Sequence, residues 1–254
     1  MLKRVLVIGG NAKNTEKYEA AAQGKDLLVR TAVKGERLPD AVTALATAAK
    51  DVQPLMDAAV ALGKRYETQL RLIGLALDMR EGKAPGTTGR VHEHAVRFAQ
   101  ALELDADARL ALEHAGYLMD IGKLRIGNDV LTKKSLLTYD EWTQLQSHTT
   151  LGAELLQEWD IFVECADILR YHHECYDGTG YPERLERDAI PRLARAMRIL
   201  DVYCAMTTPR IYRKGFSTHK QAVAYLKSER GKHFDPELLD VFIREEVGKP
   251  MKAG

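Results

Sequence analysis

The sequence predicts a mainly α-helical protein preceded by a small α/β N-terminal region. Two short apolar runs near the N-terminus, 5–8 and 27–33, have the composition of buried strands. From about residue 39 onward, apolar residues instead recur at the helical steps of three and four, and the second half of the chain has no sustained alternation of period two. Helix start signals at 105–107, 137–141 and 233–236 support the helical assignment.

Composition limits the classes of partner. The chain has 254 residues, 45% of them apolar, and its 37 Lys and Arg nearly balance its 36 Asp and Glu. Such a balance creates no field that would draw a nucleic-acid polymer or an anionic membrane. The three cysteines show no disulfide spacing, and no apolar run is long enough to cross a membrane. We therefore expect a soluble, cytoplasmic protein with free thiols and no membrane partner.

The N-terminal region, residues 1–60, is predicted to be a separate small domain. Its first strand ends at Gly9 and Gly10, and a polar helical segment separates it from the strand at 27–33. This order is similar to the first half of a receiver-type regulatory domain. The acidic pair of such domains is missing after the first strand, so we expect no phosphorylation there. The paired glycines also lack the spacing of a nucleotide-binding loop.

A helical segment over 39–80 leads into the second domain, residues 61–254. Pro54 should break or kink this helix near Gln53. Beyond it, an amphipathic stripe is formed by Leu62, Tyr66, Leu70, Ile73 and Leu77. The stripe fits a helix packed on its own core, and it is also compatible with a helix that pairs two subunits in a homodimer. The segment 81–86, rich in glycine and ending in Pro-Gly, reads as a linker-like loop.

The rest of the second domain is predicted to be a helical bundle with its site on inward-facing side chains. The expected helices are 88–104, 107–118, 139–159, 166–173, 193–206, 218–228 and 236–246.

One stretch combines metal-ligand chemistry with a glycine-rich turn: residues 171–182 read YHHECYDGTGYP. Adjacent histidines and carboxylates are ligands for divalent metals, and the Gly-x-Gly-Tyr-Pro turn needs the backbone freedom of glycine. Other polar motifs lie upstream, at 117–123 and His148, and downstream, at 199–213 and 231–236.

Together these motifs resemble the HD-GYP family, metal-dependent phosphodiesterases of bacterial cyclic di-GMP signalling, over about residues 70–245. The pattern His-His-Glu-x-x-Asp-Gly-x-Gly-Tyr-Pro is matched at every specified position from His172 to Pro182. The resemblance implies an HD-superfamily helical bundle. It also implies a centre of two or three metals whose bridging hydroxide attacks the phosphodiester.

The resemblance assigns roles to individual residues. One metal, which could be iron, manganese or zinc, would be held by Asp120, His148, His172 and His173, and Asp201 matches a further acidic ligand. Asp120, Lys123 and Asp201 would be the catalytic group. The phosphates would meet Lys123, Arg210 and Arg213, for which the alternative is solvated cations at helix ends. Ligand-binding residues Gly180, Tyr181 and Pro182 would shape the signature loop, which in relatives also binds diguanylate cyclases or adaptor proteins.

The second half of the family's centre is altered. Met119 stands in place of the histidine of the HD pair, and Thr87 in place of the histidine of an upstream His-x-x-Arg-Val motif. Lys83 replaces an acidic ligand, and Cys204 replaces a second aspartate. A shifted register would use His94 instead of Thr87. We prefer the gap-free register, in which His92, His94 and His114 are ordinary helix residues.

These substitutions predict a degenerate member with one metal per chain that binds cyclic di-GMP and has weak or absent phosphodiesterase activity. The alternative is an active metal-dependent phosphodiesterase that produces linear pGpG or GMP. A third hypothesis, a scaffold without metal, would leave three histidines and two aspartates clustered at a cost in desolvation.

Overall fold

The computed structural model describes residues 4–9, 27–32, 53–157, 162–208 and 217–249, with side chains from Tyr66 onward. By its internal contacts the chain divides into two units, residues 1–69 and 70–254. The domain boundary expected after residue 60 stays a prediction. Across the described residues, no helix is both long enough and apolar enough for a membrane span.

The first unit contains the two strands that the sequence predicts. Strand β1, Arg4–Gly9, pairs in parallel with β2, Leu27–Ala32, and Arg4 lies opposite Leu27. The helical segment expected between them lies outside the described residues, so the α/β character of this region stays a prediction.

Helix α3, Gln53–Arg80, begins where Pro54 predicts an interruption. Proline is tolerated in the first turn because its missing N–H would have no partner there. Leu70 and Leu77 of the predicted stripe are buried, whereas Ile73 is 38% exposed. A Cβ atom at Gly74 would lie 2.6 Å from Thr88 Oγ1, so the end of α3 packs closely on the next helix.

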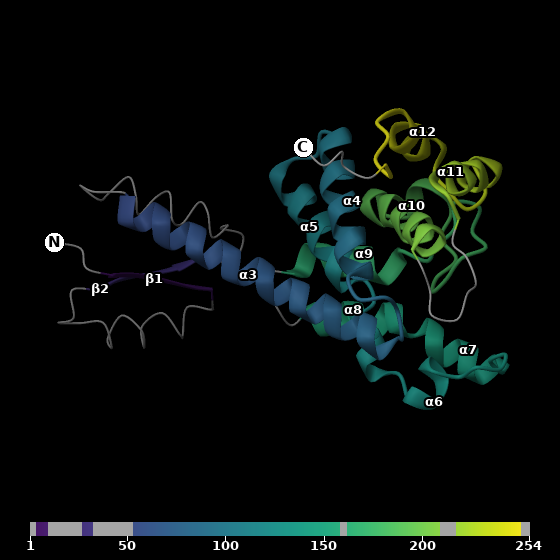
Figure 1. Cartoon of the computed structure of the whole chain (residues 1–254), viewed down its shortest axis with the longest axis horizontal. Coiled ribbons are helices and arrows are strands. Elements are labelled where there is room, and N and C mark those ends of the chain that lie inside the picture. Colours follow the sequence, from purple (N-terminus) through teal and green to yellow (C-terminus); the bar gives the residue numbers. More distant parts are fainter. Residues whose placement is uncertain (1–3, 10–26, 33–52, 158–161, 209–216, 250–254) are drawn as a thin grey trace. The chain divides into compact units, whose positions relative to one another are not determined.

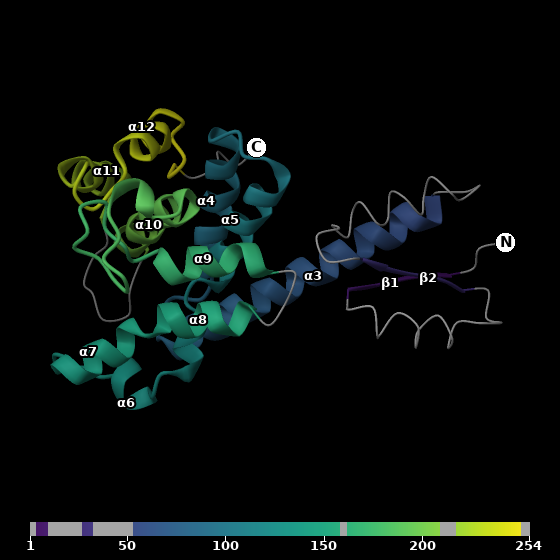
Figure 2. The same ribbon diagram turned by 180° about the vertical axis from the view of Figure 1, so that it is seen from behind.

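The second unit is a helical bundle, as predicted (Figure 1). Helix α10, Arg192–Thr207, packs against α4, α5, α9, α11 and α12. Figure 2 shows α11 and α12 at one end of this unit and α6 and α7 at the other. The helices besides α3 and α10 are α4, Thr87–Ala101; α5, Ala106–Leu118; α6, Asn128–Leu131; α7, Tyr139–Gln146; α8, His148–Gln157; α9, Val163–Tyr171; α11, His219–Ser228; and α12, Pro236–Arg244.

The predicted helix starts carry the expected caps. The Asp105 carboxylate accepts from the backbone N–H groups of Asp107 and Ala108 at the start of α5. Thr138 and Glu141 form a reciprocal capping box at α7. Asp235 caps α12, whose first position is proline. Each cap satisfies N–H groups that have no partner inside the helix.

Most of the predicted helices differ from the observed ones by one to three residues at an end, and two differences concern the histidines. The single helix expected over 139–159 is two helices, α7 and α8, which meet at Ser147. The hydroxyls of Ser147, Thr149 and Thr150 donate to backbone carbonyls three residues earlier, and such bonds compete with a regular helix. Helix α9 ends at Tyr171 rather than residue 173. As a result His148 begins one helix, and two further histidines directly follow another.

Candidate metal centre

Three histidines meet inside the bundle. His148 is the first residue of α8, and His172 and His173 follow α9. One ring nitrogen from each lies within 4.8 Å of the others. Helices α8 and α9 pack against each other, and this pairing brings residues about 24 positions apart in sequence together. These three of the predicted ligands are therefore assembled as a group that could hold a metal ion.

In two of the three rings, the Nε2 atom is buried and carries a free lone pair. The Nδ1–H of His148 donates to the Leu145 carbonyl at 2.7 Å, and that of His172 donates to the Leu169 carbonyl, also at 2.7 Å. Since a carbonyl only accepts, each Nε2 carries the lone pair, and neither Nε2 has a hydrogen-bond partner. Burial lowers the pKa of His148 to about 3 and also lowers that of His172, so both rings stay neutral. Buried, neutral and unpartnered nitrogens fit a metal.

The third ring is held differently. Arg198 of α10 donates from Nη1 to Nδ1 of His173 at 3.1 Å. A guanidinium has no acceptor, so Nδ1 of His173 must accept and its neutral ring carries the proton on Nε2. Tyr181 stacks on the same ring, with centroids 4.8 Å apart. His173 can offer Nε2 to a metal only after that proton leaves or Arg198 moves aside. In the sequence Arg198 is one of three arginines among the apolar residues of α10, and no local pattern marks it as a partner of His173.

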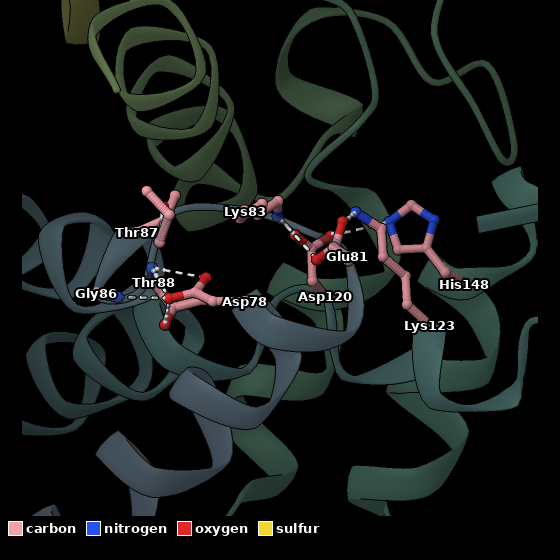
Figure 3. Close-up of polar contacts among 10 residues, drawn as sticks. Asp78, Glu81, Lys83, Gly86, Thr87, Thr88, Asp120, Lys123 and His148 are labelled. Atoms are coloured by element: carbon pink, nitrogen blue, oxygen red, sulfur yellow. Dashed lines mark hydrogen bonds and ion pairs between the residues drawn. The ribbon is translucent and has the colours of Figure 1, made fainter. Parts of the chain in front are cut away.

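Asp120 lies beside the histidines but is bound to two lysines. Its Oδ1 is 3.5 Å from His148 Nε2 and 2.8 Å from Lys123 Nζ, and its Oδ2 is 2.8 Å from Lys83 Nζ (Figure 3). Burial would raise the pKa of this carboxyl, but Lys123 and Lys83 outweigh that effect and hold the pKa well below its usual range. Asp120 is therefore a carboxylate, as a metal ligand must be.

A second carboxylate comes from the loop that reads as a linker. Glu81 Oε1 is 2.8 Å from Lys83 Nζ, and its Oε2 is 2.7 Å from Lys123 Nζ (Figure 3). Burial opposes the charge of Lys83, yet Asp120 and Glu81 raise its pKa above the usual lysine value. The segment 81–86 thus contributes side chains to the centre, a role that its glycine and proline content concealed.

Asp78 fixes this loop onto helix α4. The N-cap of α4 is Gly86, which has no side chain to cap the helix. The completely buried Asp78 carboxylate caps the helix instead. It accepts hydrogen bonds from Gly86 N at 2.9 Å, from Thr88 N at 3.2 Å and from the Thr88 hydroxyl at 3.3 Å. An acidic residue on a helix face gave no signal in the sequence that it caps a different helix.

A pocket lies beside Lys83 and Met119. Its lining residues are Lys83, Thr87, Val91, Met119, Asp201, Cys204, Ala205 and Thr208. Thr87 and Met119 both line this pocket, and the gap-free register stays a prediction. His94 instead packs edge-on against Tyr203, with centroids 5.5 Å apart. Among the described residues, the histidine group does not include Asp201, which faces this pocket.

The signature loop is locked against the end of α9. A Cβ at Gly180 would lie 2.3 Å from Cys175 N and 2.5 Å from Glu174 Cα, so only glycine fits there. The buried Glu174 accepts from Glu183 N at 2.7 Å, and the Tyr181–Pro182 peptide is cis. The predicted phosphate contacts Arg210 and Arg213 lie outside the described residues.

Glycine also sets the distance between Asp120 and His148. Asp120 precedes the short 3-10 helix η1, Ile121–Arg125, which packs on α8. A Cβ at Gly122 would lie 1.9 Å from the His148 carbonyl oxygen and 2.6 Å from Gly152 N. The backbones therefore touch at this point, and their contact places the carboxylate beside the ring.

The donor set suits a borderline divalent metal. Imidazole nitrogens and one carboxylate match zinc or iron, and such a metal, when bound, would lower the pKa of its water and supply a nucleophile. The fit of the set rests on the unpartnered Nε2 atoms of His148 and His172.

Comparison with known proteins identifies the family of the second unit. A family model described as HD domain matches residues 71–238. The chain is 34% identical over 183 residues to the cyclic di-GMP phosphodiesterase response regulator RpfG of Xanthomonas campestris, which covers 71% of this chain and 48% of that protein. It is 39% identical over 140 residues to a probable cyclic di-GMP phosphodiesterase of Vibrio cholerae, covering 52% of this chain and 32% of that protein.

A solved structure shares the fold. The crystal structure of the cyclic GMP-AMP specific phosphodiesterase V-cGAP3 of Vibrio cholerae matches with a TM-score of 0.55 at 22% identity, over 72% of this chain and 48% of that one. The chain spans about half the length, or less, of these relatives. The match of residues 71–238 covers well over half of the chain, which therefore belongs to the HD domain family and is related to its cyclic dinucleotide phosphodiesterases.

Proposed function

We propose that this chain is a metal-dependent phosphodiesterase that hydrolyses cyclic di-GMP to linear pGpG or GMP at the histidine centre. The observation that carries the proposal is the pair of unpartnered Nε2 atoms of His148 and His172, buried beside the carboxylate of Asp120. In this proposal the metal is held by these three residues, with His173 joining once Arg198 releases it. Asp201 then acts from the neighbouring pocket as a further ligand or by orienting a water.

Cyclic di-GMP is proposed as the substrate because relatives with 34% and 39% identity are named for it. Another relative, 31% identical, is named as a 3'3'-cGAMP-specific phosphodiesterase, so the general class is a cyclic dinucleotide. In this chain the phosphates would meet Lys123, Arg210 and Arg213, while Gly180, Tyr181 and Pro182 shape the adjoining loop. A guanidinium or ammonium forms charge-assisted bonds with a phosphate.

The proposal is tested by turnover. The full chain is freed of metal, given iron or manganese, and incubated with cyclic di-GMP and separately with 3'3'-cGAMP, and the products are separated by chromatography. We expect linear product with the wild type and none with His172→Ala. A matched control is His233→Ala, since His233 is a partly exposed histidine next to the turn before α12. Full turnover by His172→Ala would contradict the assignment.

A second candidate, binding of cyclic di-GMP with weak or absent turnover, is favoured by the pocket that brings Thr87, Met119 and Lys83 together. A thioether is a poor ligand for a borderline divalent ion, and an ammonium is none. Isothermal titration of the metal-loaded chain separates the candidates: binding without product supports the sensor, and product supports the enzyme. A protein partner at the signature loop and a homodimer through α3 remain proposals of the same kind.

A further inference from the structure

The two oxygens of Asp120 face different cations. Oδ1 lies between Lys123 Nζ and the bare Nε2 of His148, on the histidine side of the carboxylate. Oδ2 is 2.8 Å from Lys83 Nζ, which approaches from the side opposite His148 (Figure 3). Lys83 Nζ is also 2.8 Å from Glu81 Oε1, and its side chain is only 16% exposed. This ammonium is therefore held between two carboxylates rather than extended into solvent.

The surroundings of Lys83 offer little to a metal ion. In the adjoining pocket, the Thr87 hydroxyl already donates to the Ala84 carbonyl at 2.6 Å. Met119 supplies a thioether, and burial raises the pKa of the Cys204 thiol to about 12, so it is protonated. Asp201 is the one carboxylate of this lining, and the lining contains no imidazole. A divalent ion placed here would have few donors and an ammonium beside it.

We propose that the Lys83 ammonium takes the position of a second cation at Asp120, so that the centre is built for one metal ion and one fixed side-chain charge. This inference rests on the proposed metal centre. Lys83 carries one positive charge, needs no loading, and neutralises the Oδ2 side of Asp120 without a coordination shell. It would also repel a metal ion that approached Asp120 from the pocket.

The test counts metals in matched variants of the full chain. Each is loaded with manganese and desalted, and metal per chain is measured by elemental analysis. Electron paramagnetic resonance then separates isolated Mn²⁺ ions from coupled pairs. The double variant Thr87→His/Met119→His adds two imidazoles to the pocket but keeps the ammonium. The triple variant adds Lys83→Glu. We expect one metal in the wild type and in the double variant, and two coupled metals in the triple variant.

The single variant Lys83→Met gives a second measurement, because methionine keeps an unbranched side chain and removes the ammonium together with its contacts to Asp120 and Glu81. We expect it to bind the single metal ~10-fold more tightly than the wild type, since a positive charge near the site is gone. Two metals in the wild type or in the double variant would overturn the inference, as would one metal in a folded triple variant or unchanged affinity in Lys83→Met. No metal in the wild type would instead overturn the proposed metal centre itself. Circular dichroism confirms that each variant is folded.

Discussion

Replacing Gly122 by alanine should separate the two halves of the metal centre. The new Cβ would lie 1.9 Å from the His148 carbonyl oxygen, whereas ordinary contact begins near 3.4 Å, and the atoms it meets are all backbone. The start of α8 must therefore move by roughly 1.5 Å away from η1. Ligand distances in a metal site tolerate only about ±0.2 Å. His148 and Asp120, whose nearest atoms are now 3.5 Å apart, would no longer share one ion.

We expect Gly122→Ala to weaken metal binding at least ~100-fold and to lower the free energy of unfolding by roughly 1–3 kcal/mol, the usual cost of overpacking. Calorimetric titration with metal gives the first value, and denaturant unfolding of the metal-free chain gives the second. The control is Gly89→Ala in α4, where an added Cβ meets no atom within 4 Å. That variant should keep its metal affinity and gain about 0.5–1 kcal/mol, because alanine favours a helix. Equal metal affinity in both variants would refute the argument.

Three further predictions follow from buried groups. Burial, together with His92, lowers the pKa of His114 to about 4, below its unfolded value of about 6.5. The unfolded chain therefore binds more protons between these values, and stability falls with falling pH, by about 2 kcal/mol between about pH 7.5 and 5 for this residue. His114→Gln should flatten the profile of unfolding free energy against pH, and an unchanged slope would count against it. Asp78→Ala should cost ~1–3 kcal/mol by leaving the Gly86 and Thr88 donors unpaired, and should speed proteolysis within 81–86. Gly180→Ala should disorder the signature loop, seen as loss of hydrogen-exchange protection at residues 178–185, whereas retained protection would contradict the close packing on Cys175.

Helix positions were predictable because they follow from local patterns. Three helix starts were predictable from Asp105, Thr138 and Asp235, because each side chain accepts hydrogen bonds from backbone N–H groups two or three residues later. The start of α3 was predictable from Pro54, which fits only the first turn of a regular helix. The junction at Ser147 was missed because the apolar spacing continues across it. The hydroxyl bonds that interrupt the helix are also made by residues that are common inside helices.

Of the metal centre, only the residues that belong to the sequence motifs were predictable. His148, His172 and His173 are assembled as the resemblance implied. Glu81, Asp78 and Arg198 were missed, because their partners lie on other elements at separations that no local pattern encodes. Lys83 was identified from the sequence only as the replacement of an acidic ligand. The structure shows an ammonium bound to the same carboxylate that a metal would use.

Asp120 forms ion pairs with two lysines, and these pairs affect which metal the centre should prefer. Its charge is largely balanced by Lys83 and Lys123 before any ion arrives, so a metal would be held mainly by the neutral rings of His148 and His172. Magnesium and manganese favour oxygen ligands, whereas zinc and iron bind imidazole well. In competition dialysis the chain should therefore retain zinc or iron over a large excess of magnesium, with manganese between them. Lys83→Met should reduce the difference in affinity between manganese and zinc, because the negative charge of Asp120 is then no longer balanced by Lys83. An unchanged difference in affinity in this variant would show that the imidazole rings of His148 and His172 alone determine the metal preference.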